Sequence, residues 1–237
     1  MDSFEHFCPE HIAMLIAIVV TVSAGLFFAR KLSDKNALIL IRILSVTVLL
    51  GELIQDILLI RDGGDIIKFL PLHLCNLGIF VNLAASFTRG RIQSFFAEIS
   101  VVLILPGAIC ALLFPDWTYR PFWSYLPLLC FFTHALLVFI PLFYLVRKTA
   151  AVSFRHIWYP YLFLLAVTPP IYLLDLTAGV NYMFLLYPTQ DSPLTWISNI
   201  TGENFYLPGL AIILTVFLIL EYAGYEGTKR LAKRTSD

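Results

Sequence analysis

Two histidines, His73 and His134, lie in strongly apolar stretches of the sequence, where an ionisable side chain needs a specific reason to be present. A histidine whose pKa lies near neutrality is the usual general base in proteins. Pro71 precedes His73 and removes a backbone donor, which leaves polar backbone groups next to the imidazole. We therefore expect His73 to act as the general base and His134 as a second acid or base.

Other polar side chains of the apolar stretches could complete such a catalytic site. A carboxylate from Asp56 or Asp175 could orient the base, as the carboxylate of a catalytic triad does. The nucleophile could be Cys75, Thr133 or a hydroxyl group of the substrate itself. The amide and hydroxyl side chains expected to contact the substrate or a developing oxyanion are Gln55, Asn76, Asn181 and Tyr182.

The cysteines and histidines do not follow a metal-binding pattern. The four cysteines include no CxxC pair, and the five histidines include no H-E-x-x-H motif. We expect no metal and no other cofactor. Cys75 is two positions from His73, so on a helix the two side chains would point apart rather than form a thiolate–imidazole pair.

The composition indicates that membrane-spanning helices position these residues. Apolar residues make up 59% of the 237 residues and charged residues only 14%, against about 25% charged in a soluble domain. Disordered proteins and secreted disulfide scaffolds are excluded. The 16 Lys and Arg balance the 16 Asp and Glu, so no field attracts nucleic acid. Membrane lipid is the expected partner, and the oligomeric state is left open.

Seven apolar stretches predict an all-α, multi-pass membrane bundle in which residues 1–237 form a single domain. Each approaches the roughly 20 residues that cross a bilayer, and the breaks between them carry Gly, Pro or clustered charge. The predicted spans are residues 11–29, 37–60, 68–88, 93–115, 122–146, 156–178 and 206–225.

The distribution of Lys and Arg predicts the orientation of the bundle. Twelve of these residues flank the spans on one side, and only Arg61, Lys68 and Arg120 lie on the other. The N-terminus is therefore expected outside and the C-terminus in the cytoplasm, in the plasma membrane if the source is bacterial. Arg42, Glu98 and Glu221 would then lie in the inner half, where we expect Arg42 to pair with one of the two carboxylates. The catalytic candidates converge in the outer half: Asp56, His73, Asn76, His134, Asp175 and Asn181.

Three motifs together resemble the bacterial YwaF-like family of integral membrane proteins. They are Phe7–His11, with the sequence FCPEH, Leu70–Asn76, with the sequence LPLHLCN, and Gly179–Leu185, with the sequence GVNYMFL, followed by Pro188. That family is itself similar to the transmembrane protein 164 group of acyltransferases, which are thought to use a Cys next to a His. It is more distantly similar to the androgen-induced hydrolases of fatty-acid esters.

The resemblance implies a lipid-acyl reaction centre at His73. By position the shared histidine falls on His73, whereas the cysteine of the acyltransferases falls on Leu72. His11, in the first motif, is a further residue that we expect to contact the substrate.

Two functions from different classes remain. The first is a lipid enzyme that transfers or hydrolyses acyl esters of outer-leaflet lipid, with substrate entering between the helices. The second is a proton-coupled transporter or small-molecule carrier that uses Asp56, His73, His134 and Asp175 as a relay. Residues Val46–Leu50 are apolar except for Thr47 and separate the outer from the inner polar residues, which favours an enzyme open to one side.

Overall fold

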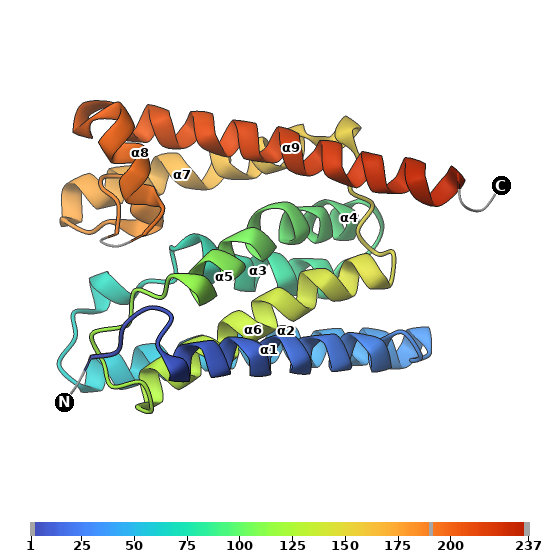
Figure 1. The fold of residues 1–237 in the computed structure, drawn as a ribbon, viewed down its shortest axis with the longest axis horizontal. Helices are drawn as coiled ribbons and strands as arrows, with labels where there is room; N and C mark the ends of the chain where they lie inside the picture. Colours follow the sequence, from blue (N-terminus) through green and yellow to red (C-terminus); the bar gives the residue numbers. More distant parts are fainter. Residues whose placement is uncertain (1–2, 190–191, 235–237) are drawn as a thin grey trace. The chain divides into compact units, whose positions relative to one another are not determined.

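The computed structural model describes residues 3–189 and 192–234, and every regular element in these two ranges is helical. The chain divides into two compact units, Met1–Ala150 and Ala151–Asp237 (Figure 1). The elements of unit 1 are α1 (Pro9–Ala29), α2 (Asp34–Arg61), η1 (Ile66–Phe69), α3 (Leu74–Phe87), α4 (Gly90–Ile99), η2 (Ser100–Ile104), α5 (Leu105–Leu113) and α6 (Tyr125–Val146). The elements of unit 2 are η3 (Phe154–His156), α7 (Trp158–Ala178), η4 (Tyr182–Phe184), α8 (Leu194–Thr201), η5 (Glu203–Phe205) and α9 (Tyr206–Arg234).

Six helical segments of the described residues are long and apolar enough to cross a membrane, and each coincides with a predicted span. They are Pro9–Ala29, Asp34–Arg61, Gly90–Leu113, Tyr125–Val146, Phe154–Ala178 and Glu203–Lys229. The protein is therefore an all-helical, multi-pass membrane protein. A seventh crossing and the orientation of the termini stay predictions.

The third predicted span, residues 68–88, is not one continuous helix. It consists of η1, an extended turn and the 14-residue helix α3. Pro71 explains the interruption, because proline lacks a backbone N–H and pushes the residue before it out of the helical region. Leu70 accordingly has φ −60° and ψ 140°, and His73 has φ −66° and ψ 155°. The result is that His73 lies on a turn at the start of a helix and not within one.

The transmembrane segment Gly90–Leu113 contains one wide turn, the π-helical stretch η2. Pro106 follows it and would clash with the carbonyl of Val102 in a regular α-helix, which accounts for the local change of pitch. All five residues of η2 are buried, and they form the centre of unit 1.

Two glycines bring the helices of unit 1 close together. A Cβ atom at Gly78 would lie 2.5 Å from Ile104 Cγ2, and one at Gly51 would lie 2.7 Å from Thr133 Cγ2. The first contact joins α3 to η2, and the second joins α2 to α6. Small residues serve this purpose in membrane helices because they allow close backbone approach.

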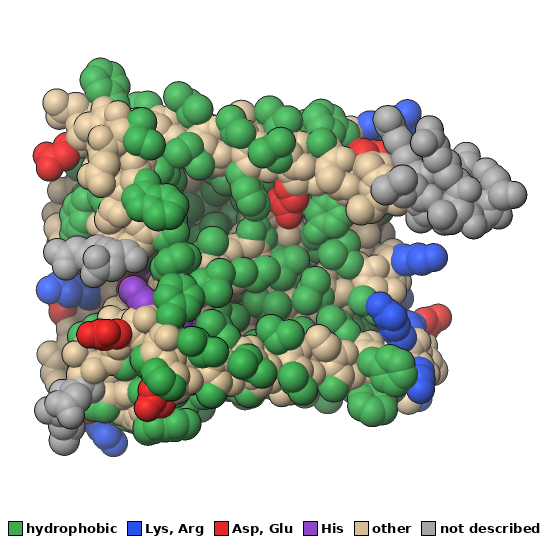
Figure 2. Space-filling model, in the orientation of Figure 1, with side chains coloured by type: hydrophobic (Ala, Val, Ile, Leu, Met, Phe, Trp, Pro, Cys, Tyr) green, Lys and Arg blue, Asp and Glu red, His purple; other side chains and the backbone are tan. Residues whose placement is uncertain are grey.

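Hydrophobic side chains cover the sides of the long helices in each unit, and most charged side chains lie near the helix ends (Figure 2). Large apolar residues on these surfaces include Ile16, Val19 and Phe28 of α1 and Ile212 and Leu220 of α9. Exposed apolar faces of this extent match a lipid environment.

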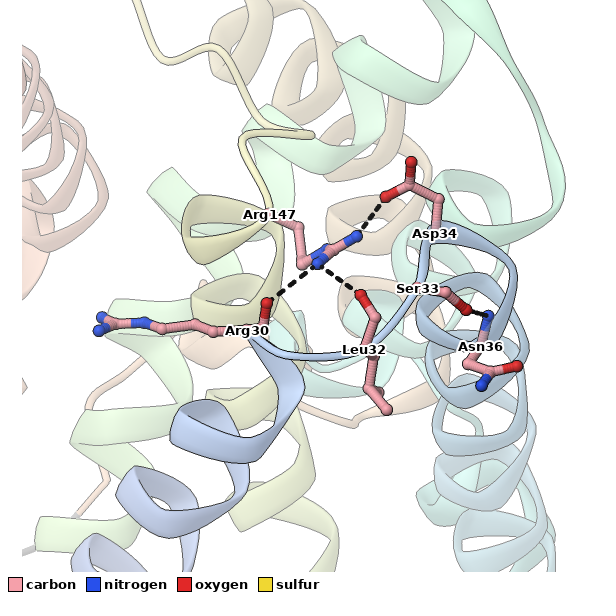
Figure 3. Close-up of polar contacts among 6 residues, drawn as sticks. All are labelled: Arg30, Leu32, Ser33, Asp34, Asn36 and Arg147. Atoms are coloured by element: carbon pink, nitrogen blue, oxygen red, sulfur yellow. Dashed lines mark hydrogen bonds and ion pairs between the residues drawn. The ribbon is translucent and has the colours of Figure 1, made fainter.

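A basic residue at the end of α6 holds the loop between α1 and α2. Arg147 donates from Nη1 to the carbonyls of Arg30 (3.4 Å) and Leu32 (3.1 Å), and from Nη2 to the carboxylate of Asp34 (Figure 3). Its side chain is 16% exposed, whereas that of Asp34 is fully exposed. The two carbonyl contacts should therefore matter more than the ion pair, because exposed ion pairs contribute little.

We expect Arg147→Ala to lower the free energy of unfolding by about 1–2 kcal/mol, since two loop carbonyls lose a charged donor. Asp34→Asn, the matched control, should leave stability nearly unchanged. Denaturant unfolding of detergent-solubilised protein measures both, and an equal loss in the two variants would contradict this assignment.

Candidate active site

Polar side chains of unit 1 gather where the second half of α2, the start of α3, the loop after α5 and the first half of α6 meet. Two hydrogen bonds join these elements: Asn76 Nδ2 donates to Glu52 Oε1, and Cys130 Sγ donates to Gln55 Oε1 at 3.1 Å. We call this group the His73–His134 cluster. Its members are Glu52, Gln55, His73, Cys75, Asn76, Asp116, Trp117, Cys130, Thr133 and His134.

A carboxylate that the sequence analysis did not select lies near both histidines. Asp116 is close enough to interact electrostatically with His73 and His134, and also with Cys75 and Cys130. The sequence placed Asp116 only in a break between two predicted spans. Its signal was an acidic residue directly beside an apolar segment, but the sequence did not show which helices meet there.

His73 is half-buried, and its carbonyl accepts the backbone N–H of Leu77 at 2.9 Å. As the residue that precedes the first turn of α3, it projects from the turn that Pro71 creates. Asp116 gives it a nearby negative charge of the kind expected from Asp56 or Asp175. Orienting roles for those two residues stay predictions.

The hydrogen bond of His134 defines which of its nitrogens carries the proton. Nδ1 lies 2.8 Å from the carbonyl oxygen of Cys130, and a carbonyl can only accept. Nδ1 is therefore the donor, and in the neutral ring Nε2 presents a lone pair. No residue in the described part of the chain hydrogen-bonds to Nε2. In its neutral form His134 can therefore accept a proton at Nε2.

Thr133 is less well placed for chemistry. It is 5% exposed, and its hydroxyl donates to the same Cys130 carbonyl at 3.1 Å. Its methyl group faces Gly51 of α2. To act as a nucleophile, Thr133 would have to give up this hydrogen bond, so that role stays a prediction.

Glu52 is a second member that the sequence analysis left out of the candidate site. It is 8% exposed and accepts the side-chain amide of Asn76, three residues after His73. Its contact holds the first turn of α3 against α2. Asn76 consequently has a structural partner besides the substrate-binding role predicted for it.

His11 is fully buried and uses both ring nitrogens in backbone contacts. Nδ1 accepts the N–H of Phe7 at 3.0 Å, so Nε2 carries the proton and donates to the carbonyl of Leu112 at 2.8 Å. The ring stacks on Phe7 and lies 5.5 Å from the ring of Phe131, measured between centroids. These contacts give His11 a structural role, and the predicted substrate contact stays untested.

The segment before α1 holds the loop that carries Asp116 and Trp117. Phe4 N donates to Thr118 O at 3.1 Å, and His6 Nε2 lies 2.9 Å from Pro115 O. The two contacts flank the loop residues on either side. The residues directly before the first sequence motif therefore act on the cluster by positioning this loop.

Asp56, another site candidate, lies in α2 of unit 1 near Glu52. Three further site candidates belong to unit 2, where they organise one loop. Asp175 is fully buried, and its Oδ1 accepts the N–H of Tyr182 at 2.9 Å. Asn181 donates to the carbonyl of Tyr187 at 2.8 Å and accepts the N–H of Leu186 at 2.9 Å. The third sequence motif thus forms a hydrogen-bonded turn after α7.

A second polar group lies deeper in unit 1, around Asn82. Asn82 Oδ1 accepts the hydroxyl of Ser100 at 2.6 Å, and its backbone carbonyl accepts Tyr144 at 3.3 Å and Ser45 at 3.4 Å. Farther along α2, Arg42 donates to the Ser86 carbonyl at 3.1 Å. No ion pair of Arg42 occurs among the described residues, so the expected partner carboxylate is not found there.

An apolar layer separates the two polar groups of unit 1. Val48 lies between Ser45 and Glu52 along α2, and Ile79 lies between Asn76 and Asn82 along α3. Both residues are at most 2% exposed, as is Ile104 of η2. Within residues 3–189 and 192–234, no three His, Cys, Asp or Glu side chains are grouped to hold a metal ion.

These features define a multi-pass membrane protein with a histidine- and carboxylate-containing cluster among its helices. The family model of the TMEM164 family matches residues 6–222, which is nearly the whole chain, and the protein belongs to this family. The resemblance to the transmembrane protein 164 group is thereby confirmed. No curated protein and no solved structure matched the chain.

We expect His11→Ala to lower the free energy of unfolding by about 2–4 kcal/mol, because a backbone donor and a backbone acceptor lose their buried partner. His6→Ala, which removes one less buried contact to the same part of unit 1, should cost clearly less. Denaturant unfolding in detergent compares the two variants. A His11→Ala protein as stable as the wild type would contradict the structural role.

Proposed function

We propose that the protein is a membrane-embedded lipid enzyme that transfers or hydrolyses acyl esters, with His73 as the general base. The observation that carries this proposal is the Asp116 carboxylate in electrostatic range of His73 and His134. Removal from water disfavours a charged imidazole at both positions, and the negative charge of Asp116 partly offsets this by stabilising the imidazolium that forms when the ring takes a proton. Membership of the TMEM164 family supports the proposal.

In the proposed reaction His73 takes the proton from the hydroxyl group of an acceptor lipid or from water. The oxygen attacks the ester carbonyl carbon of the donor lipid, and the imidazolium then returns the proton to the leaving alkoxide. A lipid acceptor yields a new ester and a lysolipid, whereas water yields a free fatty acid and a lysolipid. Both outcomes use the same residues.

A substrate hydroxyl or water fits the cluster better than a protein nucleophile does. The hydroxyl of Thr133 is buried and engaged with its own helix. Removal from water is the main factor that disfavours a thiolate at Cys75, and the nearby Asp116 carboxylate adds like-charge repulsion. No covalent acyl-enzyme is therefore needed in the proposed mechanism.

The transporter alternative finds less support in the arrangement of unit 1. A proton relay needs polar groups across the depth of the bundle. The buried apolar layer of Val48, Ile79 and Ile104 interrupts the polar groups between the His73–His134 cluster and Asn82. A reaction centre that is open on one side requires no such path.

The test uses purified protein in nanodiscs that contain a labelled diacyl phospholipid and a lysolipid acceptor, with products followed by mass spectrometry. We expect the wild type to move label to the acceptor or release it as fatty acid. His73→Ala should lower the rate by at least about 100-fold, the usual contribution of a general base. Asp116→Asn should give a smaller loss, and Cys75→Ser should leave most activity.

His156→Ala is the matched control, because it removes an imidazole from unit 2. Its rate should equal that of the wild type. Equal rates for the wild type and His73→Ala would contradict the role of His73. Absence of label movement in the wild type would contradict the acyl reaction for these lipids.

A further inference from the structure

Trp117 has a buried hydrogen-bond donor that nothing in the described part of the chain satisfies. Its side chain is 6% exposed, and its indole Nε1 has no hydrogen-bond partner among the described residues. Buried donors are almost always paired in native proteins, because an unpaired donor has lost water and gained nothing in exchange. A donor of this kind at a candidate active site indicates a position that a ligand fills.

The surroundings of Trp117 place it within the His73–His134 cluster. Its ring centroid lies 5.2 Å from that of His134, at an interplanar angle of 36°, and packs edge-on against Phe131 at 5.7 Å. Its neighbour in sequence is Asp116, the carboxylate in electrostatic range of both histidines. The sequence analysis had no means of selecting Trp117, since tryptophan near a membrane boundary is common.

The partner that Nε1 lacks is a hydrogen-bond acceptor. A phosphate group would bring a negative charge beside Asp116, which is electrostatically unfavourable. A neutral carbonyl oxygen avoids this repulsion and suits an apolar environment. The ester of an acyl lipid supplies such an oxygen.

We propose that Trp117 is a catalytic residue whose indole N–H binds the ester carbonyl oxygen of the substrate lipid. This inference rests on the proposed function. When the acceptor oxygen attacks the carbonyl carbon, the π electron pair of the carbonyl moves to its oxygen, and the proton of the acceptor moves to the imidazole. The N–H of Trp117 then donates to the resulting oxyanion. When the oxyanion collapses, the ester C–O bond breaks and the leaving oxygen takes the proton back.

The kinetic test compares Trp117→Phe with Trp123→Phe in the nanodisc assay. The first substitution removes the N–H but keeps an aromatic ring against His134 and Phe131. The second makes the same change at a tryptophan that is 69% exposed and lies outside the cluster. We expect Trp117→Phe to lower kcat by about 100- to 1,000-fold with little change in KM, as loss of one oxyanion donor does. Trp123→Phe should match the wild type.

A spectroscopic test does not depend on turnover. The protein has four tryptophans, so ¹⁵N-indole labelling gives four N–H resonances, and Trp117→Phe identifies the one from Trp117. The His73→Ala variant is placed in nanodiscs of ether-linked phosphatidylcholine, and ester-linked dioleoyl phosphatidylcholine is then added. We expect the Trp117 resonance to move downfield with the ester lipid and to stay in place with more ether lipid.

The two tests separate failure of this inference from failure of the proposed function. An ester-specific shift without any acyl movement in the wild type would keep the carbonyl site and overturn the enzyme. Acyl movement that Trp117→Phe leaves unchanged would overturn the role of Trp117 and keep the enzyme. A resonance that responds equally to both lipids, or to neither, would assign the N–H to the headgroup or to an internal water and overturn the inference.

Discussion

The interior of a bilayer offers no hydrogen-bond partner, so every polar group at that depth must find one within the protein. In unit 1 this partner is repeatedly a backbone carbonyl. The Cys130 carbonyl accepts both Thr133 and His134, and the Leu112 carbonyl accepts His11. Because a carbonyl only accepts, each contact fixes the proton on one ring nitrogen. His11 and His134 therefore have opposite tautomers, with the proton on Nε2 of His11 and on Nδ1 of His134.

The hydrogen-bonded polar side chains of unit 1 form two groups at different depths. Asn82 collects three hydroxyl groups, and Glu52 with Asn76 closes the junction of α2 and α3. Between them lie the buried apolar side chains of Val48, Ile79 and Ile104 and the glycine contact of α3 with η2. Among the described residues of unit 1, two buried side-chain donors lack a partner, Asn82 Nδ2 and the indole Nε1 of Trp117. Of these two, Trp117 lies beside a histidine and a carboxylate. Exceptions of this kind concentrate at functional sites, where a substrate completes the hydrogen bonding.

Hydropathy was sufficient to locate every long helix, because a run of roughly 20 apolar residues matches the thickness of a bilayer and is rare elsewhere. The sequence analysis expected one span over residues 68–88 and did not predict the non-helical turn at Pro71, because hydropathy does not register how proline interrupts a helix. The sequence also selected both histidines of the cluster, since an imidazole in an apolar segment is costly. It could not select Asp116 or Trp117, which lie in a short loop whose neighbours come from distant helices. The order of the spans gives the depth of a residue but not which faces of the helices meet, so the sequence did not select Glu52. Asp175, by contrast, was selected from the sequence as a catalytic candidate. In the structure its buried carboxylate accepts a hydrogen bond from the loop that follows its own helix.

The contacts of the segment before α1 have a consequence for the order in which the protein assembles. His6 reaches a carbonyl 109 positions later in the chain, and His11 reaches one 101 positions later. During synthesis this segment must wait until the ribosome has produced α5 and the loop that follows it. Contacts between residues so far apart in sequence form late, because a long loop has to close before they contribute. The loop that bears Asp116 and Trp117 can therefore be fixed only after five helices have been made, so the His73–His134 cluster is completed late in synthesis.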